Sequence, residues 1–397
     1  MLLKRFSNLI LVVTVAATAI APLSNVYSAP LASVRARADF KSDAPDQAAR
    51  LAAIERAIDE KRKQLHIPGV SLVIVKDDKA IYSKGLGVKD VERNEAVTPD
   101  TLFAIGSNSK AFTALAAIVS ADEGKMSLDD SPKKYLPYFK LQDPEADARV
   151  TIRDLLSHQS GLAGTDLAWY TGVLNREEVI RAACLAKPTA KLREKFQYQN
   201  VMYSAAGEAV ARAQNSTWED VIATRFFKPL GMKSSNTSVK QMQKSSDFAI
   251  GYEVSNNAPS RLPLRDLTNI APAGAINSNA RDMAEWLRFL LAGGVYNGKR
   301  LVSEKGFNEW ITKQIAASGT TGYALGWAVA DWRGHKVLMH TGGIDGFHSL
   351  VAWMPDQKLG FVMLTNVSES PIMGTALNAV WTNLVGGGTA PAETGQP

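Results

Sequence analysis

The order of apolar patterns along this 397-residue chain is the feature that most restricts its fold. Short β-rich runs lie at 70–75 and 80–84, and four more lie between 325 and 365. The stretch from about 110 to 291 has mostly helical spacing, interrupted by long polar loops. Strands that alternated with helices would indicate a parallel sheet, and this order does not. We therefore predict an α+β fold with one antiparallel sheet built from both chain ends, flanking helices and an inserted, mainly helical lobe.

Local signals predict where individual elements begin and end. Polar residues 76–79 separate the first two β-rich runs, as the turn of a hairpin does. Turn residues at 332–334 and 355–358 separate the later strands. The expected elements are a helix over 48–66, a hairpin over 70–84, a helix from the N-cap Ser278 to Gly293, strands over 325–330, 336–341, 349–354 and 359–365, and a helix over 371–384.

The N-terminal segment has the pattern of a cleavable export signal. Lys4 and Arg5 precede an apolar run from Leu9 to Ala21, and small residues follow near Ser28. A spanning helix needs about 20 apolar residues, so this run is short for a permanent anchor. We expect residues 1–28 to be removed and the mature protein to be periplasmic or secreted, without stable membrane insertion. An uncleaved anchor is the alternative.

Composition and spacing divide the rest of the chain and exclude some functions. We expect a linker over 29–45, a folded domain over 46–385 with its helical lobe at about 125–270, and a flexible tail over 386–397. The net charge of +6 is mild and no dense Lys/Arg block occurs, whereas nucleic-acid binding needs a concentrated basic face. Cys184 is the single cysteine, so no internal disulfide can form. We find no zinc-ligand spacing and expect no metal or cofactor.

Ser107 and Lys110 form the first candidate catalytic pair. A serine hydroxyl becomes a strong nucleophile only when a base takes its proton. Residues three apart on a helix share a face, and the apolar helix expected after Ser107 would bury Lys110. Burial lowers the proton affinity of an amine and lets it act as a base. A second Ser-x-x-Lys begins at Ser131, but it precedes a proline in a polar stretch, so the context favours Ser107.

Two later motifs could complete a site. In Tyr198-Gln199-Asn200, the phenol of Tyr198 can relay a proton and the amide of Asn200 can bind a substrate carbonyl. In His340-Thr341-Gly342, at the end of an expected strand, the glycine lets a substrate backbone approach and the other two side chains offer donors. Taken singly, each motif also fits a core tyrosine beside a turn, or an ordinary strand end.

The order of the three motifs resembles the serine β-lactamase and penicillin-binding protein family. The similarity is to the Tyr-x-Asn branch, which includes class C β-lactamases, DD-peptidases and related esterases, and it covers about 48–385. The flanking sequences agree: Thr101–Gly106, Leu155–Leu162, Pro272–Gly274, Ser278–Trp286 and Gly326-Trp327.

The resemblance implies the same α+β fold and an acyl-enzyme mechanism. Ser107 would attack a carbonyl while Lys110 and Tyr198 handle its proton. The backbone N–H groups of Ser107 and Gly343 would form the oxyanion hole. Asn200 would hold the substrate, and His340, Thr341 and Gly342 would line the opposite wall. His158 lies in a structural loop of the family pattern and is not expected to be catalytic.

His340 departs from the Lys-Thr-Gly usual in class C β-lactamases. Histidine carries little charge near neutral pH. We therefore expect a serine hydrolase that cleaves amide or ester bonds of D-amino-acid peptides or small esters. The alternatives are a true β-lactamase and a catalytically silent, penicillin-binding-like sensor or scaffold. The expected partner is a small-molecule or peptide substrate, and the sequence leaves the oligomeric state open.

Overall fold

The computed structural model describes residues 44–385. The expected signal segment, most of the linker and the tail from residue 386 lie outside the described residues. Helix α1 (Ala44–Gln64) begins two residues inside the stretch expected to be a linker. Within the described range, no helix is both long and apolar enough to cross a membrane.

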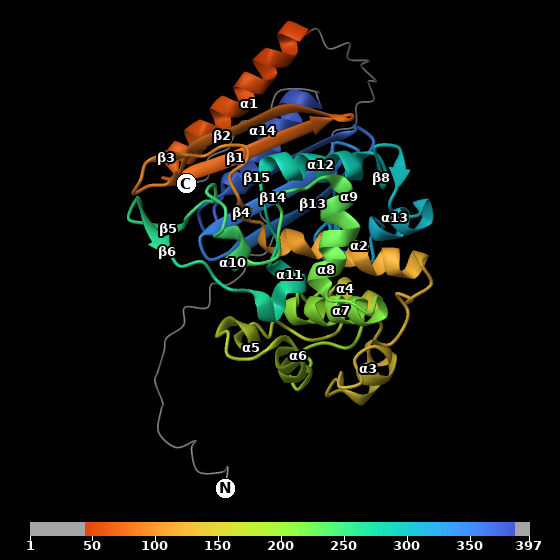
Figure 1. The fold of residues 1–397 in the computed structure, drawn as a ribbon. Helices are drawn as coiled ribbons and strands as arrows, with labels where there is room; N and C mark the ends of the chain where they lie inside the picture. The colour runs from red at the N-terminus through yellow and green to blue at the C-terminus, as the bar shows by residue number, and fades with distance from the viewer. Residues whose placement is uncertain (1–43, 386–397) are drawn as a thin grey trace, which may run out of the picture. The chain divides into compact units, whose positions relative to one another are not determined.

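A nine-stranded antiparallel sheet joins the two ends of the described chain (Figure 1). Its order is β10-β11-β12-β13-β14-β15-β1-β2-β3. The N-terminal and C-terminal strands meet where β1 pairs with β15, with Val70 opposite Thr365. This pairing confirms the predicted sheet. The strands are β1 (Gly69–Lys76), β2 (Lys79–Asp90), β3 (Glu95–Ala96), β10 (Ile315–Ser318), β11 (Thr321–Tyr323), β12 (Ala328–Trp332), β13 (His335–Ile344), β14 (Phe347–Met354) and β15 (Leu359–Thr365).

Alternation of side chains along the central strands creates a core on each face of the sheet. Leu72 and Ile74 pack on one side with apolar residues of α1 and of α14 (Ile372–Leu384). Val73 and Val75 point to the other side, toward α12 (Ala280–Leu291) and the rest of the domain. Because helices cover both faces, β1 is buried along nearly all of its length.

The lobe packs on the second face through α2 (Ser109–Asp122), whose residues from Ser109 to Ser120 are all buried. Helix α7 (Asn200–Ala213) packs against α2 (Figure 1). A hairpin of β5 (Gly251–Ser255) and β6 (Ala258–Leu262) adds strands that the sequence did not predict. The other elements are β4 (Phe103–Ala104), η2 (Gly106–Asn108), η3 (Pro132–Lys134), α3 (Pro144–Arg149), α4 (Ile152–Leu156), α5 (Leu167–Tyr170), α6 (Arg176–Cys184), α8 (Trp218–Ile222), η4 (Ala223–Phe227), α9 (Lys228–Leu230), α10 (Val239–Met242), η5 (Thr268–Ile270), α11 (Ala271–Gly274), β7 (Asn277–Ser278), β8 (Val295–Tyr296), β9 (Lys299–Arg300) and α13 (Glu304–Trp310).

One expected helix start was wrong by a residue. Asn279, not Ser278, is the N-cap of α12, because its side chain accepts from the backbone N–H of Asp282. Ser278 instead belongs to the short strand β7, opposite Phe103. The residue that the local pattern assigned to the helix cap is therefore part of a neighbouring strand.

Candidate active site

Ser107 lies in a 3-10 turn, η2, directly before α2. The turn begins at Gly106, whose φ of +50° suits glycine. Asn108 donates through Nδ2 to Ser349 Oγ at 2.8 Å, and Ser349 Oγ donates to the Ile105 carbonyl at 2.8 Å. These bonds fix the turn to β14. Ser107 remains partly exposed while both its neighbours are buried, so a rigid turn carries a residue that reaches the surface.

Lys110 is fully buried, with Nζ 2.9 Å from Ser107 Oγ. The same nitrogen donates to Asn200 Oδ1 at 2.7 Å and to the Ala273 carbonyl at 2.8 Å. Both of these oxygens can only accept. When the amine is neutral, its two N–H groups remain bonded to them and its lone pair points at Ser107. The geometry therefore suits Lys110 to remove the proton of Ser107.

Burial lowers the pKa of Lys110 to about 7, and the negative charge of Asp166 acts in the opposite direction. Near neutral pH, a substantial fraction of this amine is therefore uncharged. Burial has the opposite effect on Tyr198, raising its pKa well above the ordinary value. Of the two groups beside Ser107, the lysine is the one that can accept a proton at pH 7, and the tyrosine stays protonated.

Tyr198 is hydrogen-bonded to Ser107, and its ring centroid lies 4.8 Å from Lys110 Nζ. The buried side chain of His158 packs against the ring of Tyr198, with ring centroids 4.3 Å apart. The backbone N–H of Gln199 donates to His158 Nδ1 at 3.0 Å, and that of Gln197 donates to the His158 carbonyl at 2.9 Å. His158 thus supports the loop around Tyr198.

Asn200, at the start of α7, links Lys110 to a carboxylate. Its Oδ1 accepts from Lys110, and its Nδ2 donates to Asp166 Oδ1 at 3.0 Å. These partners fix the orientation of the amide, because the ammonium can only donate and the carboxylate can only accept. Asp166 was not anticipated, since it belongs to no motif and lies 34 residues before Asn200. The sequence contains no signal that would have identified it.

Strand β13 packs against the nucleophile turn and forms one wall of the candidate site. Strand β12 pairs with β13 only between His335 and Met339, which leaves 340–344 without a strand neighbour on that side. A Cβ on Gly342 would lie 1.9 Å from the Ile105 carbonyl oxygen, and one on Gly106 would lie 3.0 Å from Gly343 N. Glycine is thus required for the strand to approach the nucleophile turn so closely. The approach brings the backbone of Gly343 beside that of Gly106-Ser107.

His340 is buried and both of its ring nitrogens have protein partners. Nδ1 lies 2.6 Å from the Thr341 carbonyl, which can only accept, so Nδ1 carries the proton. Nε2 then accepts from the Tyr323 hydroxyl at 3.0 Å. Burial, reinforced by the charge of Lys110, lowers the pKa of His340 to about 3. The imidazole is therefore neutral at physiological pH, and the exposed Thr341 is the polar side chain that this motif presents to solvent.

The structure brings Ser107, Lys110, Tyr198 and Asn200 together with residues 340–343 of β13. The second Ser-x-x-Lys lies elsewhere. Ser131 precedes the short turn η3, and Lys134 forms an exposed ion pair with Asp130 at 2.9 Å. The two instances of the motif therefore differ in the burial of the lysine.

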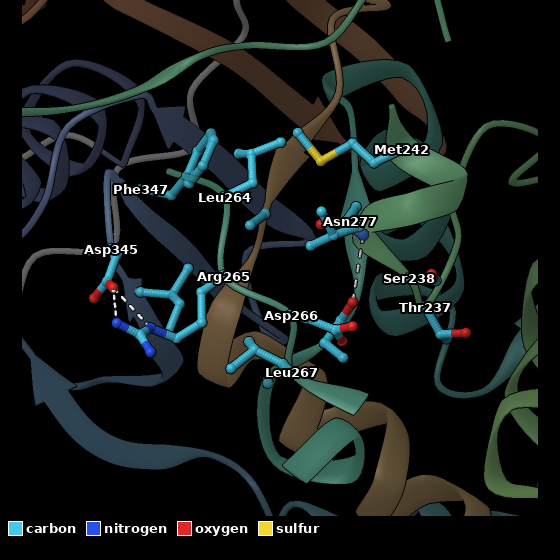
Figure 2. Close-up of a pocket in the computed structure, with 15 residues that line it drawn as sticks. Thr237, Ser238, Met242, Leu264, Arg265, Asp266, Leu267, Asn277, Asp345 and Phe347 are labelled. Carbon is cyan, nitrogen blue, oxygen red and sulfur yellow. Dashed lines mark hydrogen bonds and ion pairs between the residues drawn. The ribbon is translucent and has the colours of Figure 1, made fainter. Parts of the chain in front are cut away.

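A small cavity adjoins the nucleophile turn (Figure 2). It encloses about 10 Å³, room for about one water molecule. Arg265 and Asp345 lie on its wall and pair with each other, Arg265 Nε being 2.7 Å from Asp345 Oδ2. Gly274 lines this cavity and lies against the nucleophile turn, because a Cβ on Gly274 would be 3.8 Å from the Gly106 carbonyl carbon. It therefore stands between the cavity and the turn. Ser107 is not part of its lining, so a substrate would bind on the open side of the turn.

The chain is similar to several known proteins. The model of the Beta-lactamase family matches residues 54–381. The chain is 31% identical to Protein flp of Staphylococcus aureus, strain N315, over 80% of this chain and 63% of that one. It is 30% identical to Unguisins hydrolase ungD' of Aspergillus campestris, over 79% of this chain and 61% of that one. It therefore spans less than two thirds of the length of either relative.

A solved structure shares the fold. The octameric penicillin-binding protein homologue from Pyrococcus abyssi superposes with a TM-score of 0.75 at 28% identity, over 85% of this chain and 78% of that one. This likeness confirms the predicted fold class. The match to the family model over most of the chain shows that this protein belongs to the beta-lactamase family of serine hydrolases.

Proposed function

We propose that the protein hydrolyses amide or ester bonds of D-amino-acid peptides or small esters through an acyl-enzyme on Ser107. The observation that carries this proposal is the arrangement of Lys110. Two acceptor oxygens hold two of its N–H groups, and the third position of the nitrogen faces Ser107 Oγ at 2.9 Å. A buried amine with a pKa near 7 in this geometry is a general base for the hydroxyl beside it.

In acylation, Ser107 Oγ bonds to the substrate carbonyl carbon while its proton moves to Lys110 Nζ. The carbonyl oxygen becomes an oxyanion and accepts hydrogen bonds from the backbone N–H groups of Ser107 and Gly343. As the intermediate collapses, the bond to the leaving nitrogen or oxygen breaks. Tyr198 gives its hydroxyl proton to the leaving group and regains a proton from Lys110.

Deacylation reverses these roles. Water loses a proton to the Tyr198–Lys110 pair as its oxygen bonds to the acyl carbon. The bond to Ser107 Oγ then breaks, and the proton returns to the serine. Asn200 would hold a substrate carbonyl through its second Nδ2 N–H, since the first donates to Asp166.

Activity should rise with pH through a midpoint near 7. Only the neutral amine of Lys110 can accept the serine proton, and its fraction increases as pH rises through the pKa. Below the midpoint, kcat/KM should fall about tenfold per pH unit. The titratable groups around the amine are Asp166, Tyr198, Tyr203, His158 and His340.

The measurement is kcat/KM for a neutral ester between pH 5 and 9. Asp166→Asn should move the midpoint to lower pH, because the Asp166 charge raises the pKa of Lys110. A midpoint near 4 in the native protein, or activity that decreases as pH rises through 7, would contradict Lys110 as the base.

Esters and D-peptides should be hydrolysed faster than β-lactams. A β-lactam presents a carboxylate near the third motif, and a charged donor there contributes more than a neutral one. His340 is neutral and its ring nitrogens are occupied, so this contact is weak. A substrate without that carboxylate does not depend on this contact, so the neutral His340 does not weaken its binding.

This expectation, and the proposed function with it, is tested by comparing kcat/KM for p-nitrophenyl butyrate, a D-Ala-D-Ala peptide and nitrocefin. His340→Lys should raise the nitrocefin-to-ester ratio. Faster turnover of nitrocefin than of the ester by the native protein, with no change of the ratio in His340→Lys, would make the protein a β-lactamase instead.

A further inference from the structure

The side chain of Arg265 joins two loops of the candidate site. Its Nε lies 2.7 Å from Asp345 Oδ2, and its Nη2 contacts the same oxygen (Figure 2). Its Nη1 donates to the Tyr170 carbonyl at 2.8 Å, and its Cζ lies 3.8 Å from the centroid of the Tyr170 ring. Asp345 belongs to the turn after β13, and Tyr170 is the last residue of α5. Arg265 therefore connects the end of β13 to the α5 loop.

The turn after β13 lies next to the proposed oxyanion donor. A two-residue turn, Asp345-Gly346, joins β13 to β14. The proposed donor, Gly343, is two residues before Asp345, and adjacent residues of a strand are about 3.3 Å apart. Residues 340–344 have β14 on one side but no strand neighbour on the β12 side. A displacement of Asp345 would therefore move the Gly343 N–H with little resistance from that side.

The two residues of this turn are held by different contacts. The N–H of Gly346 donates to Ser368 Oγ at 3.0 Å, and its carbonyl accepts from the N–H of Tyr252 at 3.4 Å. The side chain of Asp345 has one hydrogen-bonding partner among residues 44–385, which is Arg265. Arg265 and Asp345 both line the small cavity that adjoins the nucleophile turn. Arg265 thus supports the turn on the side of the nucleophile.

The contacts of Arg265 require the shape of a guanidinium group. Two of its nitrogens bond the carboxylate, the third bonds a carbonyl, and its flat face lies on an aromatic ring. The α5 loop at the other end is itself fixed, although none of the α5 residues is buried. Asn269 Nδ2 donates to the Trp169 carbonyl at 3.0 Å, and Asp166 accepts from Asn200. Arg265 therefore links the end of β13 to an anchored loop.

We propose that Arg265 is a positioning residue that keeps the Gly343 N–H aimed at the oxyanion, acting through Asp345. This inference rests on the proposed function, because it concerns the oxyanion of acyl transfer. Arg265 touches no reacting atom. A donor stabilises the oxyanion only when it lies about 2.7–3.1 Å from the place where the charge develops. Without the contact between Arg265 and Asp345, the end of β13 shifts and this hydrogen bond lengthens.

Arg265→Met is the first test, because methionine keeps an apolar stem and removes every donor. The kcat for p-nitrophenyl butyrate should fall about tenfold, which is less than the 10²–10³-fold loss from deleting an oxyanion donor outright. KM should stay within about twofold of the native value, because the affected hydrogen bond strengthens only in the transition state. Thermal denaturation checks that the variant folds, and Asp345→Ala serves as the second variant if it does not.

The ratio of the rates of an ester and its thionoester is a readout that a merely structural role would not change. Sulfur is a weak hydrogen-bond acceptor, so a thionoester gains little from an oxyanion hole. Hydrolysis of p-nitrophenyl butyrate and of its thionoester is followed with enzyme in excess, so that the slower substrate is also measured. Arg265→Met and Asp345→Ala should each lower the ester-to-thionoester ratio about tenfold. The double variant should lose little more, because the two residues act through one contact.

Two further variants separate position from charge. Arg261→Met is the matched control, since Arg261 also pairs with a carboxylate, that of Glu92 at 3.0 Å, and has no hydrogen bond to β13. It should leave the ratio unchanged. Arg265→Lys keeps the charge but lacks the fork of donors, so it should lower the ratio. A native ratio in Arg265→Lys would mean that the charge acts through space, and the positioning role would be wrong.

Other results would also overturn the inference. Equal losses on the ester and the thionoester in Arg265→Met would show a general disturbance of the fold. Losses that multiply fully in the double variant would separate Arg265 from Asp345. Hydrolysis that depends on Ser107, with a native ratio in Arg265→Met, would refute this inference and leave the proposed function intact. No hydrolysis of either ester by the native protein, and no labelling of Ser107 by a fluorophosphonate, would refute the proposed function itself.

Discussion

Ser107→Ala should lower hydrolysis by about four to six orders of magnitude, the loss typical of removing an acyl-enzyme nucleophile. The residual rate would come from the oxyanion donors and substrate binding. The Ser107 hydroxyl has Lys110 Nζ at 2.9 Å and Tyr198 as a second partner. The measurement is kcat/KM for p-nitrophenyl butyrate, with labelling by a fluorophosphonate and mapping of the adduct by mass spectrometry.

Ser131→Ala is the matched control, because it alters the second Ser-x-x-Lys of the chain. Its lysine, Lys134, is exposed and paired with Asp130, so activity should change by less than about twofold. An adduct on Ser131, or labelling that persists in Ser107→Ala, would refute the assignment of the nucleophile. Folding of both variants is checked by thermal denaturation.

Lys110→Ala and Tyr198→Phe should each lower kcat/KM by about 10²–10⁴-fold, the usual contribution of a positioned acid or base. The double variant should lose little more than the worse single variant, because groups that act as one unit give non-additive losses. Both side chains contact Ser107, and the lysine nitrogen lies 4.8 Å from the tyrosine ring. A proton leaving the serine therefore passes through a shared network.

The pH profile separates the two roles. Tyr198→Phe should keep a midpoint near 7, because Lys110 still titrates, whereas Lys110→Ala should lose that midpoint. Losses that multiply fully in the double variant would show that the two residues act in separate steps. Lys110→Ala also leaves Asn200 Oδ1 and the Ala273 carbonyl without their donor, at about 1–3 kcal/mol for each buried group. Its folding is therefore measured alongside its activity.

Local patterns in the sequence were sufficient for the sheet and for the first catalytic pair. Short apolar runs bounded by turn signals predicted β1 and β14, and β15 matches its predicted range at both ends. Ser107 and Lys110 are three residues apart at the start of a helix, so their contact follows from helical geometry. Short strands such as β10 and β5 were missed, because they have few residues and little alternation to reveal them.

Only the tertiary structure decided the chemistry of the site. The chain brings Asn200 and Ala273 to Lys110 across separations of 90 and 163 residues, and these distant acceptors orient the amine whose burial the apolar helix had predicted. The same packing makes His340 neutral by enclosing it between Tyr323 and Thr341, and it places Asp166 beside Asn200. Spacing along a helix determines which side chains are near neighbours. The charge state of a side chain depends instead on distant segments, which exclude solvent from it and supply hydrogen bonds and charges around it.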